Sequence, residues 1–376
     1  MPIFMDRHDV PGATAADVAI AHQKDLGVQT KYNCRALTYW FDEARAVAFC
    51  LVEAPDAEAV TRMHKEAHGL VPNRIIQVHS ELVETFLGRI GDPVTTEITG
   101  EPGTPVFEDT AFRTVLAVEL KDVAILAVRY GVAVTHELLR AHDAIINGAI
   151  QRHRCDRVAK SDGLYLITSP SASNAVECAR QIQSTFNARI VGDDRTSEST
   201  LSVGMGLSAG EPVADRTDLF GDAIQWAKRM CRLARDNRIF VTSTVGNEYR
   251  RENSFTLVSE ESMMVLDPTE GRFLNELMEV TEDRWNDGQF HVEDLARRVG
   301  KSKSQLYRKL ASLTGYSPKE LLRDFRLRKA SELLETRRGN VTEVAFEAGF
   351  SSAAYFSKSF QERFGILPSA YMKVTR

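Results

Sequence analysis

Residues 341–365 read VTEVAFEAGFSSAAYFSKSFQERFG, and their pattern sets the architecture of the C-terminal part of the chain. Apolar residues recur at helical spacing up to Gly349. Ser351 or Ser352 then caps a second helix, which carries a phenylalanine at every fourth position. A helix, a turn with glycine and a second capped helix predict a helix-turn-helix unit.

The same pattern occurs once before, in residues 292–313 (VEDLARRVGKSKSQLYRKLASL), with Gly300 at the turn and Ser302 as the cap. Ser317 and Pro318 open a long helix between the two units, and Gly339 is expected to end it. About 20 residues at 1.5 Å each span about 30 Å, close to the roughly 34 Å between successive major-groove faces. Two recognition helices could therefore enter adjacent grooves of DNA, and residues 276–376 are expected to be all-α.

Two stretches of this part resemble the AraC/XylS family of transcription regulators: LARRVGKSKSQLYRKLASLTGYSPKELLRDFRLRKASELL and VTEVAFEAGFSSAAYFSKSFQERFGILPSAYM. The resemblance implies a transcription regulator that binds double-stranded operator DNA and acts on RNA polymerase. It also implies base contacts from two groups of outward positions. These are Ser304, Tyr307 and Arg308 in the first unit, and Ala353, Ala354 and Lys358 in the second.

Side-chain chemistry sorts these positions further. Arg308 is favoured for base reading because a guanidinium binds guanine edges through two hydrogen bonds. Ala353 and Ala354 are too short to hydrogen-bond bases, so the second unit contacts thymine methyl groups or only the DNA backbone. The cations expected to meet phosphates are Lys301, Lys303, Lys309, Arg323 and Arg326. The alternative for each single lysine is a solvated basic surface.

The charge distribution agrees with a DNA partner for this part of the chain. The whole chain has a net charge of −5, yet residues 281–376 hold 18 Lys and Arg against 12 Asp and Glu. The other 280 residues hold 29 against 40. A basic C-terminal part on an acidic body indicates a polyanionic partner for that part alone.

The remaining residues predict two α/β units, which makes the whole chain a multidomain α+β protein. Residues 1–90 follow the order β-α-β-β-α-β, the ferredoxin-like arrangement, with Gly27 expected to end the first helix. Residues 91–110 contain three prolines and no apolar period, which is typical of a linker and a hinge. Residues 111–255 alternate helices and strands in a second α/β domain. Residues 250–275 are expected to be a polar connection.

The second α/β unit resembles a class III nucleotide cyclase domain. The stretches that carry the resemblance are HELLRAHDAIINGAIQRH, LSVGMGLSAGEPV, DLFGDAIQWAKRMCRLA and IFVTS. It implies metal-binding carboxylates at Glu119 and Asp162, a purine-selecting pair at Lys160 and Asp218, and transition-state groups at Gln225 and Arg229. These make a tentative purine-nucleotide site.

Three departures argue against cyclase activity. Glu119 and Gln225 are each longer than the Asp and Asn of active members, and the hairpin at residues 160–163 is two residues short. Misplacement by about 1 Å can cost roughly 100-fold in rate. We therefore expect a degenerate domain that senses a nucleotide or serves as a dimerisation scaffold. The alternative is a cyclase enzyme with an attached DNA-binding domain.

Histidines gather near the N-terminus. His64 and His68 are four residues apart in an expected helix and so share one face. His8 ends the first strand, which belongs to the sheet on which this helix is expected to pack. The three imidazoles together predict a site for a divalent transition metal. Imidazole suits nickel, copper or zinc. The stretches FMDRHDVPGAT, YWFDEARAVAFCLVEAPDAEAV and HKEAHGLVP resemble a family of nickel-binding ferredoxin-like proteins, which favours nickel. The alternative is an inert oligomerisation module.

The chain is expected to be cytoplasmic and homodimeric. Its five cysteines are scattered and never spaced as CxxC, which argues against a disulfide framework and a structural zinc cluster. No stretch approaches 18 apolar residues, and the first ten residues lack the apolar run of a secretory signal. Paired DNA half-sites favour a symmetric protein held through residues 111–255. The prediction is a transcription regulator, of activator type, controlled by a metal ion or nucleotide.

Overall fold

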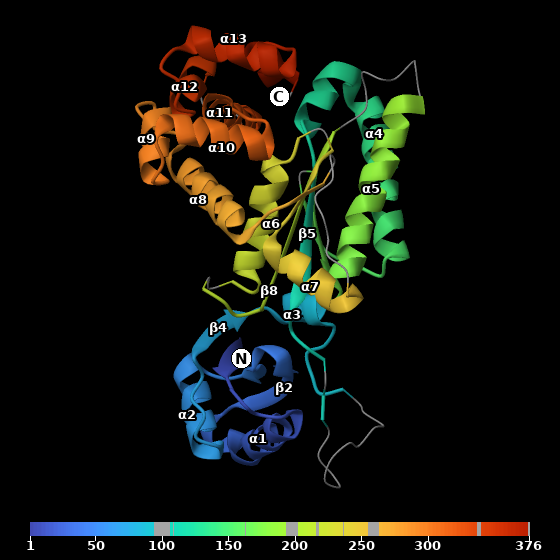
Figure 1. Cartoon of the computed structure of the whole chain (residues 1–376), viewed down its shortest axis with the longest axis vertical. Coiled ribbons are helices and arrows are strands. Elements are labelled where there is room, and N and C mark those ends of the chain that lie inside the picture. Colours follow the sequence, from blue (N-terminus) through green and yellow to red (C-terminus); the bar gives the residue numbers. More distant parts are fainter. Residues whose placement is uncertain are drawn as a thin grey trace.

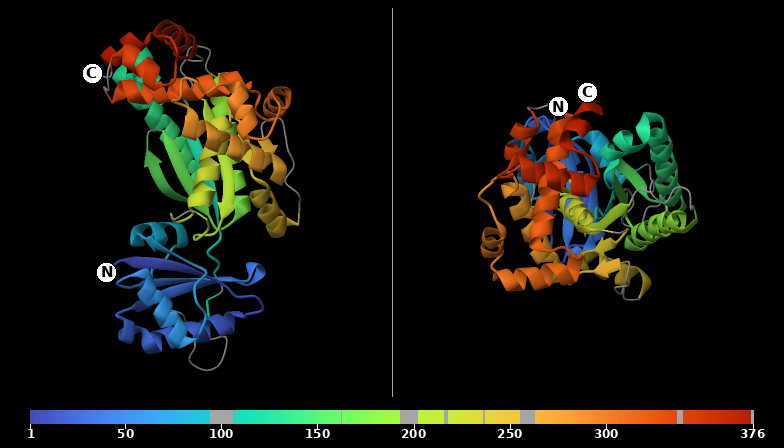
Figure 2. Two further views of the ribbon diagram at one scale, coloured as in Figure 1. Left: turned by 90° about the vertical axis from the view of Figure 1, so that its left-hand side faces the viewer. Right: turned by 90° about the horizontal axis from the view of Figure 1, so that it is seen from above.

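The computed structural model describes residues 1–93, 106–107, 109–161, 163–192, 202–215, 218–235, 237–254, 263–336 and 340–374. The chain is a multidomain α+β protein arranged in three tiers (Figure 1). An N-terminal α/β unit attaches to one end of a second α/β unit. Helices from the C-terminal part lie at the opposite end, as the left view of Figure 2 shows.

The N-terminal unit has the predicted β-α-β-β-α-β order, which is confirmed. Its elements are β1 (Ile3–Asp9), α1 (Ala15–Val28), β2 (Arg35–Asp42), β3 (Val47–Glu53), α2 (Ala57–Ala67) and β4 (Arg74–Val78). The antiparallel strands lie in the order β2-β3-β1-β4. Thr14 and Asp17 form a capping box that starts α1. The prediction that Gly27 ends α1 is wrong, because the helix runs through it into a 3-10 turn, Gln29–Tyr32.

A short helix that the sequence did not lead us to expect, α3 (Ser80–Leu87), lies between the two α/β units. Phe86 stacks on Phe220 of the middle unit, with 4.7 Å between ring centroids. The Arg113 guanidinium donates a 2.8 Å hydrogen bond to the carbonyl of Phe86. One apolar cluster includes the outer face of the N-terminal sheet, α3 and the middle sheet. The two units therefore share a core and are not joined by a linker alone.

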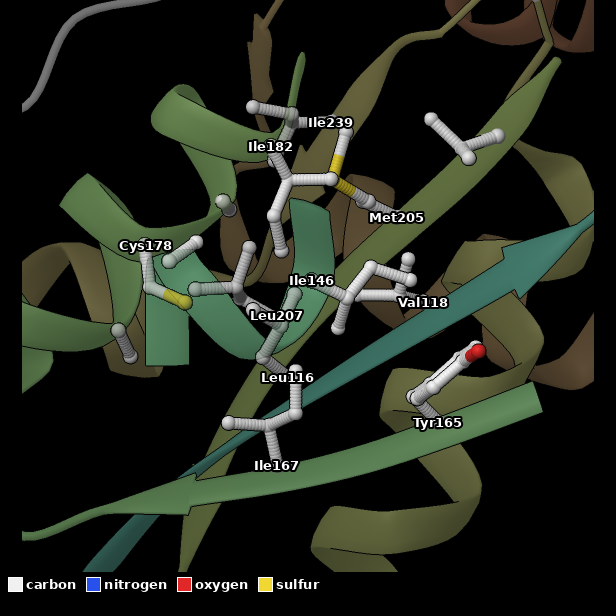
Figure 3. Close-up of a cluster of buried hydrophobic side chains, with 14 of the residues drawn as sticks. Leu116, Val118, Ile146, Tyr165, Ile167, Cys178, Ile182, Met205, Leu207 and Ile239 are labelled. Atoms are coloured by element: carbon white, nitrogen blue, oxygen red, sulfur yellow. The ribbon is translucent and has the colours of Figure 1, made fainter. Parts of the chain in front are cut away.

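The middle unit contains a six-stranded sheet in the order β10-β9-β8-β5-β7-β6. Its elements are β5 (Arg113–Leu120), α4 (Val123–Arg152), β6 (Asp156–Ser161), β7 (Leu164–Ser169), α5 (Ala172–Gly192), β8 (Val203–Gly210), α6 (Gly221–Leu233), β9 (Ile239–Val241), α7 (Ser243–Asn253) and β10 (Met263–Val265). Figure 3 shows part of the core, where Leu116 and Leu207 face Ile146 and Ile182. Residues 263–265 were expected in a polar connection, which is wrong, because they pair in parallel with β9.

Helix α6 covers the other face of this sheet at very close range. A Cβ on Gly206 would lie 2.3 Å from the carbonyl oxygen of Ala227, and one on Gly204 would lie 2.4 Å from that of Cys231. Only glycine allows this approach of a helix backbone to a strand. The packing fixes α6 on β8, and α6 in turn supports the C-terminal helices.

The helices of the C-terminal part are α8 (Pro268–Arg284), α9 (Val292–Arg298), α10 (Lys303–Thr314), α11 (Pro318–Glu335), α12 (Val341–Glu347), α13 (Ala353–Phe364) and α14 (Pro368–Val374). Helices α9 and α10 form the first predicted helix-turn-helix unit, and α12 and α13 form the second, so both units are confirmed. Ser302 caps α10 and Ser352 caps α13. The turns use Gly300 and Gly349 at positive φ. Gly339 lies outside the described residues. Among the helices described, none is long and apolar enough to cross a membrane.

Candidate metal centre and nucleic-acid interface

The three predicted metal ligands lie together in the N-terminal unit. Strand β1 directs Asp6 and His8 to the face that α1 and α2 cover, because alternate residues of a strand share a face. The ring centroids of His8 and His64 are 4.9 Å apart, and those of His64 and His68 are 5.2 Å apart. Asp25 of α1 also belongs to the cluster. The structure thus brings together residues from one strand and two helices.

Two carboxylates flank the imidazole of His64. Its Nε2 lies 2.9 Å from Asp6 Oδ2, and its Nδ1 lies 3.0 Å from Asp25 Oδ1. Burial acts to lower the pKa of His64, but Asp6 and Asp25 outweigh it and raise the pKa to about 10. Burial conversely acts to raise the pKa of Asp6, and the neighbouring imidazoles hold it well below its usual value. The protonated His64 imidazole is therefore balanced by two buried carboxylates, and a metal bound to it would have to displace that proton.

The donor set fits a transition metal. Ligand atoms of Asp6, His8, Cys50 and His64 lie within 4.8 Å of one another, as do those of Asp25, His64 and His68. Both ring nitrogens of His8 are buried, and Nε2 lies 3.2 Å from Asp6 Oδ1. Buried polar atoms normally find partners, and Nδ1 has none among the described residues, so it is the nitrogen left for a metal. A small, mainly apolar cavity of about 60 Å³ reaches the cluster beside His8 and His68.

Sequence reasoning missed the oxygen and sulfur donors of this cluster. Asp6 had a detectable signal, because it is two residues before His8 on the same strand face. Asp25 and Cys50 had none, because their place depends on how α1 and β3 pack. The histidines set aside at the sequence level do lie elsewhere: His22 contacts Asp92 at 3.1 Å, and His79 is exposed at the start of α3.

In the C-terminal part, the predicted base-reading positions of the first unit lie at the surface. Ser304 and Arg308 are exposed on α10, and Tyr307 is half-buried. Lys301 is exposed and Lys303 pairs with Glu293. Lys309 lies over the ring of Phe273, 4.8 Å from its centroid. This stacking directs the amine toward α8, so Lys309 has a contact of its own inside the protein.

The second unit presents its predicted positions on α13. Ala354 and Lys358 are exposed, and Ala353 is half-buried. Tyr355, which sequence reasoning missed, is exposed on the first turn of the same helix. A groove of about 340 Å³ runs between α10 and α13, and Lys303, Tyr307 and Tyr355 help to line it. The helix face that carries these residues is therefore open to a partner.

Two arginines of α11 have different roles. Arg323 lines the same groove, as expected of a phosphate contact. Arg326 also lines this groove. Its side chain is half-buried, and its Nε and Nη2 donate hydrogen bonds of 2.7, 2.8 and 3.0 Å to the carbonyls of Trp285, Asp287 and Phe290. It thus fixes the segment between α8 and α9 and keeps only Nη1 for a phosphate, which stays a prediction.

Of the tentative nucleotide positions, Lys160 has an ion-pair partner within the middle unit. Lys160 pairs with Asp143 at 2.8 Å, and no ion pair joins it to Asp218 among the described residues. Asp218 is exposed before α6, and Gln225 is half-buried on that helix. Asp162 lies outside the described residues. The purine-selecting pair is thus not in contact in this structure.

Arg229 and Glu119 contact the C-terminal part. Arg229 is 3% exposed, and its guanidinium donates to Glu282 at 2.8 and 3.0 Å and to Asn275 at 2.8 Å, both on α8. The Glu119 carboxylate contacts Lys121 and lies 3.4 Å from Arg328 of α11. Both positions are therefore used to join the middle unit to the C-terminal helices.

Comparison with known proteins agrees with this division of the chain. A family model described as a helix-turn-helix domain matches residues 295–373. A second model, described as nickel responsive protein SCO4226-like, matches residues 4–78. The HTH-type transcriptional regulator MtrA of Neisseria gonorrhoeae is 30% identical over 103 residues, which are 27% of this chain and 33% of that protein. The chain spans between 10% and 36% of the first curated relatives that it matches.

Two solved structures are similar to other parts. SCO4226 of Streptomyces coelicolor is 39% identical, with a TM-score of 0.20, and the match covers 20% of this chain and 94% of that protein. An adenylate cyclase of Trypanosoma brucei is 17% identical, with a TM-score of 0.31, and the match covers 38% of this chain and 80% of that one. The cyclase assignment stays a prediction. Residues 295–373 form an AraC-type helix-turn-helix domain, and residues 4–78 form a domain of the nickel responsive SCO4226-like family.

Proposed function

We propose that this protein is a transcription regulator that binds operator DNA through α10 and α13 and is controlled by a metal ion in its N-terminal unit. The exposed pair of recognition helices carries the proposal, because two such helices on one rigid domain fit successive major grooves. Helix α11 has 18 residues, which span about 27 Å at 1.5 Å per residue. RNA polymerase is the partner that such a regulator acts upon.

The metal would be held by the predicted His8, His64 and His68, with Asp6 and Asp25 as additional oxygen donors. Imidazole with carboxylate suits nickel and zinc, and the SCO4226-like family favours nickel. The ion would supply a positive charge that attracts donors from three elements. Strand β1 would provide Asp6 and His8, and α1 and α2 would provide the other donors.

Strand β1 also supports a route from the metal to the DNA-binding helices. Between Asp6 and His8, Arg7 faces the other side of the sheet, and its guanidinium contacts Glu211 directly after β8. A ligand can shift an equilibrium only through contacts that differ between two states. A metal that repositions β1 would change the Arg7–Glu211 contact, which joins the N-terminal unit to the end of β8.

The experiment is genome-wide mapping of the DNA bound by the full chain, with and without added nickel, followed by titration of the sites found. His64→Ala/His68→Ala should abolish tight nickel binding and change operator affinity by about tenfold. His79→Ala is the matched control, because His79 is exposed and outside the cluster. Identical operator titrations for the wild type and the double variant, with and without nickel, would contradict control by metal.

A nucleotide remains a second candidate for the controlling ligand, at the predicted positions Glu119, Lys160, Asp162, Asp218, Gln225 and Arg229. The middle unit supports it by its topology, because β5 to β8 with α4 and α5 repeat the β-α-β-β-α-β order. Equilibrium dialysis with a purine nucleoside triphosphate tests it, and an assay of cyclic nucleotide production tests the enzyme alternative.

A further inference from the structure

A cleft of about 340 Å³ separates the middle unit from the DNA-binding helices. One wall consists of the β5–α4 turn, Ser202 and the end of α6. The other wall consists of α11 and the second half of α13. In Figure 1 the C-terminal end of α13 lies near the start of α4, and Ile125 of α4 packs into the same apolar cluster as Phe360. Nothing in the sequence pattern indicated this cleft.

Ion pairs across the cleft neutralise two of its carboxylates. Arg363 of α13 binds Asp122 at 2.7 and 3.0 Å and Asp324 at 2.6 Å. Arg328 binds Asp324 at 3.0 Å and reaches Glu119 at 3.4 Å. Two of these contacts, Arg363 with Asp122 and Arg328 with Glu119, join the two walls, whereas both contacts of Asp324 lie within the C-terminal wall. The carboxylates of Asp122 and Asp324 are thus paired.

Two arginines in the same cleft lack such partners. No ion pair joins Arg235 or Arg323 to a carboxylate among the described residues, and the guanidinium of Arg235 lies 4.2 Å from the ring centroid of Tyr316. Glu320 lines the same cleft. The hydrogen bonds of Glu320 to Ser317 at the start of α11, and then the two arginines, lower its pKa. The guanidinium donors of Arg235 and Arg323 therefore stay available.

A buried hydroxyl provides independent evidence for a ligand. Ser359 of α13 is 2% exposed and lines the cleft, yet its Oγ has no hydrogen-bond partner. Burying a hydroxyl without a hydrogen-bond partner is unfavourable. Such a group beside two free guanidiniums is what a site for an anion with several oxygens requires, because each oxygen accepts hydrogen bonds.

We propose that this cleft binds a small phosphate-bearing molecule between the middle unit and the DNA-binding domain, held by Arg235, Arg323 and Ser359. Guanidinium groups match phosphate geometry better than lysine does. The volume lies at the lower end of the usual range for small-molecule pockets, about 300–1,000 Å³. The site is separate from the histidine cluster and from the predicted purine pair. It does not depend on the metal proposal.

The test is calorimetric titration of the full chain with inorganic phosphate and with pyrophosphate, without DNA or metal. We expect saturable binding of at least one anion, weakened at least tenfold in Arg235→Ala/Arg323→Ala and in Ser359→Ala. Arg62→Ala, an exposed arginine of α2, should bind as the wild type does. Ser359→Ala removes only an unpartnered hydroxyl, so its thermal stability should be unchanged or higher. No binding of either anion up to about 10 mM, or wild-type affinity in both cleft variants, would overturn the proposal.

A second arm separates a small molecule from the phosphates of DNA, because Arg323 also lines the groove between the recognition helices. Binding of a non-specific duplex is measured for Arg235→Ala and Ser359→Ala across a range of salt concentrations. We expect the same affinity and the same salt dependence as in the wild type. If both variants lose DNA binding to the extent that they lose phosphate, the cleft contacts the DNA backbone and the proposal is wrong.

Discussion

Arg308 is exposed on α10, one turn after Ser304, and has no ion-pair partner among the described residues. Its guanidinium is therefore available to a base. Arg308→Ala should relax or abolish specific binding, at a cost of about 1–3 kcal/mol, because a bidentate contact to guanine is lost. The measurement is a titration of operator and scrambled duplexes with the variant.

Lys301→Ala is the matched control for that prediction. Lys301 is exposed at the turn before α10 and forms no ion pair with an acid in the described part of the chain, so it is placed to meet a phosphate. Its loss should weaken operator and scrambled DNA alike and reduce the salt dependence by about one unit of slope. An unchanged preference for operator DNA in Arg308→Ala would mean that the first unit does not read bases at this position.

Asp25 is the residue that connects the metal cluster to α1. It accepts from His64 at 3.0 Å and lies 3.3 Å from Nε2 of His68. Asp25→Asn keeps the shape and removes the charge, and loss of a carboxylate at a metal site typically costs about 10–100-fold in affinity. We expect nickel affinity to fall by that factor in equilibrium dialysis. Glu58→Gln, which changes an exposed acid of α2 outside the cluster, should have no effect.

The histidines of this site could be predicted because an i, i+4 pair requires only a helix. Asp25 could not, since its position depends on the angle at which α1 crosses the sheet. Arg326 has a second role that its charge did not reveal. Its guanidinium donates to three carbonyls of the segment between α8 and α9, in addition to lining the groove. The sequence shows which residues are charged, but the packing of the chain decides which groups they contact.

Among the elements, α6 and α8 are joined by a buried ion pair. Glu282 accepts from Arg229 and also from Arg232 at 2.7 Å. Breaking a buried pair from one side costs about 3–5 kcal/mol, because the other charge is left unpaired. Arg229→Ala should therefore destabilise the chain by about 3 kcal/mol, with Arg232 retaining part of the contact. Denaturant unfolding measures it.

Gln225→Ala is the comparison for Arg229→Ala, because Gln225 is half-buried on the same helix and its side chain forms no hydrogen bond within the described residues. A surface change of this kind is usually worth less than about 0.5 kcal/mol. Equal effects of the two variants would show that Arg229 does not hold α8 in place. In that case Arg229, at the position that a cyclase would use for catalysis, would have no structural role in this protein.

Elements with local signals could be predicted from sequence, and elements without them could not. Ser317 and Glu320 form the capping box that the sequence indicates, and Ser302 caps α10 as expected. Strand β10 was missed because three residues are too few for a period, and only pairing with β9 makes them a strand. Helix α3 was missed because eight residues depend on two neighbouring sheets for their stability.

For the whole molecule, the ion pairs between the middle and C-terminal parts predict sensitivity to acid. Burial acts to raise the pKa of Glu119, but Lys121 and Arg328 outweigh it and lower the pKa to about 2. A carboxylate with a depressed pKa stabilises the fold above its unfolded pKa, and that contribution is lost as pH falls toward the folded value. Between about pH 6 and about pH 3, the wild type should lose about 2 kcal/mol more stability than Glu119→Gln does.

Denaturant unfolding at both pH values measures this difference. Glu58→Gln is the control, because Glu58 is exposed on α2 and lies far from the interdomain contact. Parallel loss of stability in the wild type and Glu119→Gln would mean that the Glu119–Arg328 contact does not stabilise the chain.

We also expect the full chain to be a homodimer held through residues 111–255. Paired half-sites on DNA reward a symmetric protein. Sedimentation of the full chain at micromolar concentration checks this, and a monomer would contradict it. The full chain is the appropriate sample, since a fragment that began at residue 276 would cut α8 in half and open the core that α8 shares with α6.

The helix α3 has a consequence for how this protein could be assembled from separate modules. It covers the outer face of the N-terminal sheet, where Trp40, Phe49 and Leu51 are buried. Cutting the chain after residue 79 would remove α3 and expose this apolar face to water, which favours self-association. If this unit were transferred to another protein by gene fusion, it should therefore carry α3 with it or find another apolar surface to cover the sheet.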